Sequence, residues 1–350
     1  MTALADILCA RIAASGPITL AEYMAECLLH PTLGYYTTRD PFGAKGDFTT
    51  APEVSQMFGE LIGLALAQSW RDQGQPPFVL AEAGPGRGTL MADILRATRA
   101  VPGLHQAMHL CLIEASPTLR AVQAHTLAAQ APRWCDRVAD LPQGALFLVA
   151  NEFFDALPIR QFQRAGRGWR ERRVGLDRGG LCLGLGPESR IAALEARLDD
   201  TTEGQIVEIC PAATAMIAEI SARIAAQGGL ALIIDYGDWT SRGDTFQALK
   251  SNAYADPFAG PGDADLTAHV DFAALAAASP LRHAYTTQGA FLERLGIGVR
   301  AAVLARNLTG DARLSHVAAT HRLTDESEMG CLFKVLALYP PASPLPAGFA

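Results

Sequence analysis

Uninterrupted apolar runs alternate along the chain with longer stretches in which apolar residues recur every three or four positions. The runs are typical of strands buried on both faces, and the periodic stretches are typical of amphipathic helices. Strands are predicted at 78–83, 108–114, 134–138, 145–150, 230–234 and 332–338, and helices at 54–72, 89–99, 211–227, 271–279 and 288–307. The alternation predicts an α/β fold with a doubly wound, mostly parallel sheet and helices on both faces.

Segments that break this alternation lie at the start of the chain and after the fourth and fifth predicted strands. Residues 2–14 and 19–29 are predicted to be helices, the second opened by a capping box of Thr19 and Glu22. A β-meander is expected after strand four, and a Gly/Pro-rich excursion after strand five. The predicted division is 1–53 (N-terminal helices and active-site loop), 54–158, 211–239 and 281–339 (core), 159–210 (meander), 240–280 (inserted loop region) and 340–350 (disordered tail).

Composition and charge argue against several classes of function. The 350 residues carry a net charge of −7 and are 49% hydrophobic, which fits a globular enzyme and argues against nucleic-acid binding. No apolar run approaches the roughly 20 residues that cross a bilayer, so no transmembrane segment is predicted. Seven scattered cysteines without a C-x-x-C pair favour a reducing compartment and argue against a zinc site, and no metal site is predicted. No signal or transit peptide is evident, so a cytoplasmic location is expected, and the oligomeric state is left open.

The stretch 78–90 carries the clearest local signal. A buried strand reaches Glu82, and the glycines Gly84, Gly86 and Gly88, with Pro85 between them, precede a helix. Glycines let the backbone bend sharply and approach a ligand, and the helix N-terminus adds unpaired N–H groups. A dinucleotide fingerprint would place its third glycine one residue later. The pattern E-x-G-x-G-x-G instead resembles the first motif of class I methyltransferases, so the turn is predicted to bind S-adenosylmethionine, with Glu82 facing its ammonium group.

Residues that close the predicted strands are the next candidates, because ligands of doubly wound sheets bind beyond the carboxyl ends of the strands. Strand two ends at Glu114, where a carboxylate can accept both ribose hydroxyls of the cofactor. Strand four runs into the segment 151–158, Asn-Glu-Phe-Phe-Asp-Ala-Leu-Pro, and strand five ends in Asp235 and Tyr236. These groups are therefore expected to surround one ligand site.

The segment 151–158 resembles the signature of the MidA-like family of class I methyltransferases, which includes the arginine methyltransferase of mitochondrial complex I assembly and bacterial relatives. The other segments that carry the resemblance are 31–36 (PTLGYY), 46–60 (GDFTTAPEVSQMFGE), 82–89 (EAGPGRGT), 265–272 (DLTAHVDF) and 321–324 (HRLT). The resemblance extends from about residue 16 to residue 338. It implies a Rossmann-like fold, S-adenosyl-L-methionine as the cofactor, and a protein arginine, on a partner such as a respiratory complex I subunit, as the methyl acceptor.

Arginine methylation calls for carboxylates, because they accept the forked N–H groups of a guanidinium and aim one nitrogen at the methyl carbon. Glu152 and Asp155 are the predicted catalytic pair. Asn151 and His269 are predicted to assist them, and Asn151 is also expected to contact the cofactor. Contacts to the substrate are predicted for Tyr35, Tyr36, Asp47, Phe48, Thr49, Thr50, Phe153, Phe154, Asp235 and Tyr236.

Other functions stay open at this point. A methyltransferase acting on a small molecule or on another side chain would use the same cofactor turn. A cofactor-binding assembly factor without turnover would keep the turn and lose the chemistry. A dehydrogenase is a more remote alternative, which absence of a thermal shift with NAD would exclude. A purely structural role for His269 is as reasonable as a functional one.

Overall fold

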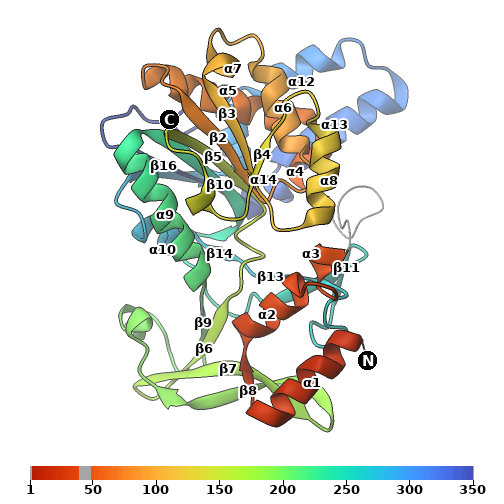
Figure 1. Cartoon of the computed structure of the whole chain (residues 1–350), viewed down its shortest axis with the longest axis vertical. Coiled ribbons are helices and arrows are strands. Elements are labelled where there is room, and N and C mark those ends of the chain that lie inside the picture. The colour runs from red at the N-terminus through yellow and green to blue at the C-terminus, as the bar shows by residue number, and fades with distance from the viewer. Residues whose placement is uncertain (1, 39–48, 350) are drawn as a thin grey trace.

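A mixed eight-stranded sheet forms the centre of the computed structural model, which describes residues 2–38 and 49–349 (Figure 1). Its order is β15-β16-β10-β5-β2-β3-β4, and the short β14 pairs with β10. The five strands from β4 to β10 are mutually parallel, whereas β16 and β15 run antiparallel at one side. The strands are β2 (Phe78–Ala83), β3 (Met108–Ile113), β4 (Arg133–Cys135), β5 (Ala145–Asn151), β10 (Gly229–Asp238), β14 (Val270–Asp271), β15 (Arg282–Thr287) and β16 (Phe333–Tyr339). The predicted doubly wound α/β fold is confirmed.

Helices cover both faces of this sheet, as the uninterrupted apolar runs require. Successive residues of β2, such as Phe78 and Val79, enter two different apolar clusters on opposite faces. One cluster includes residues of α5, α6, α11, α12 and α13, and the other includes residues of α9 and α10. The helices of the core are α4 (Ala51–Val54), α5 (Gln56–Asp72), α6 (Thr89–Thr98), α7 (Leu104–Ala107), α8 (Pro117–Thr126), α9 (Pro211–Gln227), α10 (Phe272–Ala277), α11 (Gln288–Arg294), α12 (Ile297–Ala305), α13 (Gly310–Thr324) and α14 (Met329–Leu332).

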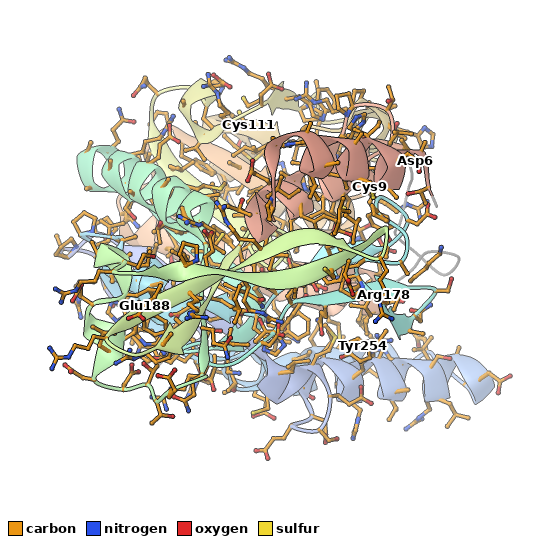
Figure 2. All side chains as sticks on the ribbon, turned by 90° about the horizontal axis from the view of Figure 1, so that it is seen from below. Asp6, Cys9, Cys111, Arg178, Glu188 and Tyr254 are labelled. Atoms are coloured by element: carbon orange, nitrogen blue, oxygen red, sulfur yellow. The ribbon has the colours of Figure 1, made fainter. Side chains whose placement is uncertain are left out.

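The chain start packs on the predicted meander rather than on the core sheet. Thr19 and Glu22 form the expected capping box at α2, and β1 pairs with β7 through Ile18 and Val174. Figure 2 views this sheet from below, with Glu188 and Arg178 toward opposite ends of the long β7–β8 hairpin. The elements are α1 (Ala3–Ser15), α2 (Leu20–Leu29), α3 (Tyr35–Thr38), β1 (Ile18–Thr19), β6 (Arg160–Ala165), β7 (Gly168–Asp177), β8 (Gly180–Ser189) and β9 (Ile206–Ile209), with one-turn helices at Val138–Asp140, Ala192–Leu194 and Ala196–Leu198.

The excursion after strand five contains a small antiparallel sheet of order β12-β11-β13. Its strands are β11 (Gln247–Lys250), β12 (Ala253–Ala255) and β13 (Asp265–Thr267). Ser251 and Asn252 join β11 to β12 with φ angles of +52° and +59°, as a two-residue hairpin turn of type I′ requires. Ala248 and Leu266 pack in one apolar cluster with residues of α1 and α2, which fixes the small sheet beside the N-terminal helices (Figure 1).

The C-terminal part differs from the sequence prediction in several places. The single helix expected at 288–307 is two helices, because Gly296 adopts a left-handed φ of +88° between them. The strand β15 and the helix α13 were not expected, since neither carries a clear apolar stripe. The expected disordered tail instead lies against the core, where the ring of Phe349 is 5.2 Å from that of Phe291. Among residues 2–38 and 49–349, no helix is long and apolar enough to cross a membrane.

Candidate active site

A cavity of about 590 Å³ lies beyond the carboxyl ends of the parallel strands, where the strand order reverses between β2 and β5. The core side of its wall is built from the loops after β2, β3, β4 and β5, from Tyr236 within β10 and from the junction of α14 and β16. The opposite side is built from α2, α3, β11, β12 and β13. The cavity therefore lies between the core sheet and the N-terminal helices, and it is large enough for a nucleoside-sized ligand.

The glycine turn after β2 forms one end of the cavity. Gly84, Gly86 and Gly88 have φ angles of +65°, +51° and +83°, which side-chain-bearing residues rarely adopt. A Cβ on Gly84 would lie 2.5 Å from Cδ2 of Phe153, so no side chain fits there. Gly84 and Gly86 line the cavity, and Gly88 caps α6 behind them. The turn thus presents bare backbone to a ligand, as predicted.

Glu114 follows β3 and lies on the cavity wall next to this turn. Its Oε1 accepts the Ser116 N–H at 2.8 Å, and its Oε2 accepts the amide of Gln123 at 3.1 Å. Gln123 is fully buried, and its Nε2 also donates to the carbonyl of Gly86 at 2.8 Å. One side chain therefore connects the glycine turn to the carboxylate. No pattern in the sequence singled out Gln123, because a lone polar residue in a helix is normally exposed.

Glu82, which precedes the glycine turn, does not line the cavity. Its side chain is 2% exposed and lies behind the glycine turn, outside the cavity wall. Burial, reinforced by the nearby charge of Glu114, raises the pKa of Glu82 to about 8, while a hydrogen bond from the Met91 backbone opposes the rise. Its Oε2 has no partner among the described residues. This oxygen can therefore accept a further donor.

The turn after β5 presents Glu152 to the cavity in a strained backbone conformation, with a φ of +51°. Its Oε1 accepts the Ala51 N–H and the Asn151 side-chain amide, each at 3.0 Å. Burial raises the pKa of Glu152 to about 7, although the Ala51 N–H lowers it. Asn151 itself lies behind the wall and orients Glu152 rather than lining the cavity.

Asp235 does not line the cavity, contrary to its predicted contact with the substrate. It is completely buried, and its Oδ2 accepts the backbone N–H groups of Phe153, Phe154 and Asp155 at 3.2, 2.9 and 3.2 Å. Its Oδ1 accepts the N–H of Tyr236 at 2.9 Å. The carboxylate thus holds the turn 152–155 in place. Since four backbone N–H groups already donate to it, it is not available to a substrate.

Asp155 and two tyrosines form the acidic end of the cavity. Asp155 is 6% exposed, and its Oδ1 has no hydrogen-bond partner among the described residues. Burial raises the pKa of Asp155 to about 6, against the effect of the Tyr236 hydroxyl. The hydroxyl of Tyr36 donates to Oδ1 of Asp265 at 2.7 Å. Burial and then the neighbouring charges of Asp265 and Asp155 keep the pKa of Tyr36 well above its usual range. The two aspartates therefore lie near the same hydroxyl.

His269 also lies on the cavity wall, and its ring centroid is 5.4 Å from that of Tyr236 in an edge-to-face contact. Burial lowers the pKa of His269, and the charge of Lys334 lowers it further. The imidazole is therefore neutral near pH 7 and available as a hydrogen-bonding group at this position.

The remaining predicted residues are divided between the wall and the interior. Phe153 lines the cavity, whereas Tyr35 and Phe154 are buried away from it, and Thr50 caps the start of α4. Pro85 and Thr49 are not part of the wall. Asp47 and Phe48 lie outside the described residues. No cluster of His, Cys, Asp and Glu suited to a metal ion occurs within residues 2–38 and 49–349.

The charge of the cavity is its most distinctive property. Five carboxylate side chains line it, and the described residues of the wall include no lysine or arginine. The five are Glu114, Asp136, Glu152, Asp155 and Asp265. Asp136 is exposed and forms an ion pair with Arg120, whereas the other four are buried or partly buried. These four favour a cationic ligand, because a buried carboxylate gains from a nearby positive charge.

Sequence comparison finds relatives along nearly the whole chain. The mouse protein arginine methyltransferase NDUFAF7, mitochondrial, is 38% identical over 363 residues, covering 94% of this chain and 83% of that protein. The human protein of the same name is 37% identical over 367 residues, covering 94% and 82%. The Drosophila melanogaster homolog is 36% identical and covers 96% and 85%. The expected cytoplasmic location is wrong on this comparison, because these relatives are named mitochondrial.

Structure comparison agrees with the sequence relatives. A COG1565 superfamily member from Burkholderia thailandensis, crystallised with S-adenosyl-homocysteine, has a TM-score of 0.87 and 34% identity, covering 99% of this chain and 94% of that one. A second, native crystal structure from Burkholderia thailandensis has a TM-score of 0.84 and 33% identity, with the same coverage. Residues 61–290 match the model of an S-adenosyl-L-methionine-dependent methyltransferase family. The chain therefore belongs to this family of S-adenosyl-L-methionine-dependent methyltransferases, in agreement with the MidA-like motifs of its sequence.

Proposed function

We propose that the enzyme transfers the methyl group of S-adenosylmethionine to a guanidinium nitrogen of an arginine in a protein. The observation that carries this proposal is the cavity wall, with five carboxylates and, among the described residues, no lysine or arginine. The cofactor and a guanidinium are both cations, so two positive charges must be held close together during transfer. A strongly acidic cavity offsets their mutual repulsion. The names of the relatives, protein arginine methyltransferases, support the same acceptor.

The cofactor fits the end of the cavity at the glycine turn. Gly84 and Gly86 line the cavity with backbone alone, and Glu114 can accept the ribose hydroxyls with the lone pairs that Ser116 and Gln123 leave free. Contact of Glu82 with the ammonium group of the cofactor stays a prediction, and its side chain is buried outside the cavity wall. When bound, the cofactor supplies an electrophilic methyl group on a sulfonium, which is a good leaving group.

Glu152 and Asp155 would hold the acceptor and receive its proton. Each carboxylate lines the cavity, and the Oδ1 of Asp155 lacks a partner that a guanidinium N–H would provide. Methylation forms one N–C bond, breaks the S–C bond and releases one proton from the attacking nitrogen. Glu152 is suited to accept that proton, since its pKa is raised to about 7. Phe153 would exclude water from this position, and Tyr236 and His269 would complete the wall.

The identity of the acceptor is tested by labelling. Purified enzyme is incubated with S-adenosylmethionine carrying a labelled methyl group and a cell lysate, and labelled residues are identified by mass spectrometry. We expect label on arginine side chains of a protein. Label confined to small molecules or to another side chain would contradict the proposal, as would a folded, cofactor-binding enzyme that transfers no label. A respiratory complex I subunit, implied by the family resemblance, stays a prediction that the same experiment tests.

A further inference from the structure

One face of the small antiparallel sheet forms a wall of the cavity. In the register of its strands, Leu249 of β11 is paired with Asp265 of β13 on one side and with Tyr254 of β12 on the other. Directly paired residues of antiparallel strands point to the same face of a sheet. All three side chains line the cavity, so they form one continuous cross-strand row.

The row changes from charged and buried to aromatic and exposed. Asp265 is 4% exposed and accepts the hydroxyl of Tyr36, Leu249 is partly buried, and Tyr254 is 78% exposed at the surface (Figure 2). Two other exposed apolar side chains, Leu29 and Leu332, line the same cavity. The row therefore connects an apolar rim to the acidic interior.

The length of the row matches an arginine side chain. Neighbouring strands lie about 4.8 Å apart, so the backbones at Asp265 and Tyr254 are separated by about 10 Å. The five bonds from Cα to the guanidinium carbon span about 6 Å when extended. The bond from the guanidinium carbon to a terminal nitrogen, followed by a charge-assisted hydrogen bond of about 2.8 Å, accounts for most of the remaining distance. An arginine whose backbone lies at Tyr254 thus reaches the carboxylate of Asp265.

We propose that this row is the binding site for the acceptor arginine. The guanidinium lies between Asp265 and Asp155, and the methylenes lie over Leu249. An apolar residue of the acceptor protein, next to the arginine, packs on Tyr254. The inference rests on the proposed function and names the residues that select a long cationic side chain. The Tyr36 hydroxyl lies near both aspartates, so it positions Asp265. A side chain shorter by one methylene would not reach the carboxylate of Asp265.

Binding without turnover tests the row directly. The probes are Nα-acetyl-arginine methylamide and its analogue with one methylene fewer, titrated by NMR into enzyme saturated with S-adenosylhomocysteine. For the wild type we expect the shorter probe to bind at least fivefold more weakly. Asp265→Asn keeps the shape and an acceptor for Tyr36, so it should weaken the arginine probe at least tenfold and abolish the preference for length. Affinity for S-adenosylhomocysteine should stay unchanged.

Transfer kinetics add a second readout, with a matched control on the same strand. Tyr254→Ala should raise KM for the labelled acceptor protein threefold to tenfold and leave kcat nearly unchanged. Lys250 follows Leu249 and so points to the other face of the sheet, where it forms an ion pair with Asp263. Lys250→Ala should therefore leave both parameters and both probe affinities unchanged.

The outcomes separate this inference from the proposed function. If arginine is methylated but Asp265→Asn binds both probes like the wild type, the row is overturned and the function stands. If label appears on a residue other than arginine while probe binding still depends on Asp265 and on length, the row is supported and the function is overturned. A wild type that binds the two probes equally well contradicts the row by itself.

Discussion

The two ends of the cavity are built in different ways. The cofactor end comes from residues close in sequence, since Gly84, Gly86 and Glu114 follow two neighbouring parallel strands. The acceptor end combines Tyr36, Asp155 and Asp265, which come from the N-terminal helices, the turn after β5 and the small sheet. The first can be recognised as a motif, whereas the second exists only after three distant segments have folded together.

The two ends also differ in how their carboxylates are paired. Both oxygens of Glu114 already accept N–H donors, which preorganise the group. Asp155 instead keeps a buried oxygen without a partner among the described residues. An unpaired buried acceptor costs free energy, which a bound donor would recover. Glu114 is thus oriented before its ligand arrives, whereas Asp155 gains a partner when a donor binds.

The largest effect is expected at the glycine turn. Gly86→Val would force a β-branched residue into a φ of +51° and place methyl groups in the cofactor space. We expect affinity for S-adenosylmethionine to fall by at least about a hundredfold, more than about 2.7 kcal/mol, in a protein that remains folded. Calorimetric titration with circular dichroism checks both points. Unchanged affinity in the folded variant would remove residues 84–88 from the cofactor site.

At the acceptor end, Asp155→Asn should separate transfer from cofactor binding. The substitution keeps the shape and removes the charge that faces the guanidinium. Loss of one member of a buried charge pair costs about 3–5 kcal/mol, so transfer should slow by at least about a hundredfold. Affinity for S-adenosylmethionine should change less than threefold. Glu152→Gln should slow transfer similarly, and equal loss of cofactor binding in both variants would erase the distinction between the two ends.

Glu114→Ala should act only at the cofactor end. Two hydrogen bonds from the ribose to a charged acceptor, each worth about 1.5–3 kcal/mol, would be lost. A loss of at least about tenfold in cofactor affinity is therefore expected, whereas binding of the acceptor probe to the saturated enzyme should persist. Leu64→Ala, at an exposed position on α5 outside the cavity wall, is the control. A shift in the dissociation constant below threefold would exclude the ribose contact.

The smallest effect is expected in the pH dependence of the transfer rate, which depends on the carboxylates of the acceptor end. The pKa of Glu152 is raised to about 7 and that of Asp155 to about 6, so both are protonated at low pH and hold a guanidinium poorly. Transfer at saturating cofactor should therefore rise about fivefold between pH 6.5 and pH 8. Raised acid pKa values have the opposite effect on stability. The folded state keeps protons that the unfolded chain releases, so these two groups stabilise the ligand-free protein below about pH 4 and lose that effect through pH 6–7. A flat rate profile would contradict the role of both carboxylates.

The sequence predicted most of the core strands and helices, for a physical reason. Buried parallel strands are long apolar runs, and a glycine turn has a fixed spacing, so both can be recognised locally. Asp235 was misjudged because its position at a strand end does not reveal that backbone N–H groups of 153–155 occupy it. Tyr254 and Leu249 were missed because only strand register aligns them with Asp265. The segment 265–272 was noticed, but its partners lie in a polar stretch without periodicity.

The pairing of Ile18 with Val174 has a consequence for synthesis of the chain. The apolar side chains of α1 and α2, among them Leu8 and Met24, are buried in the finished protein against segments made much later. At roughly 5–20 residues per second, a ribosome needs about 8–30 s to add the 156 residues that separate the two partners. During that interval the first helices have no sheet to cover them. The apolar faces of α1 and α2 therefore gain their native partners only after the meander has been made.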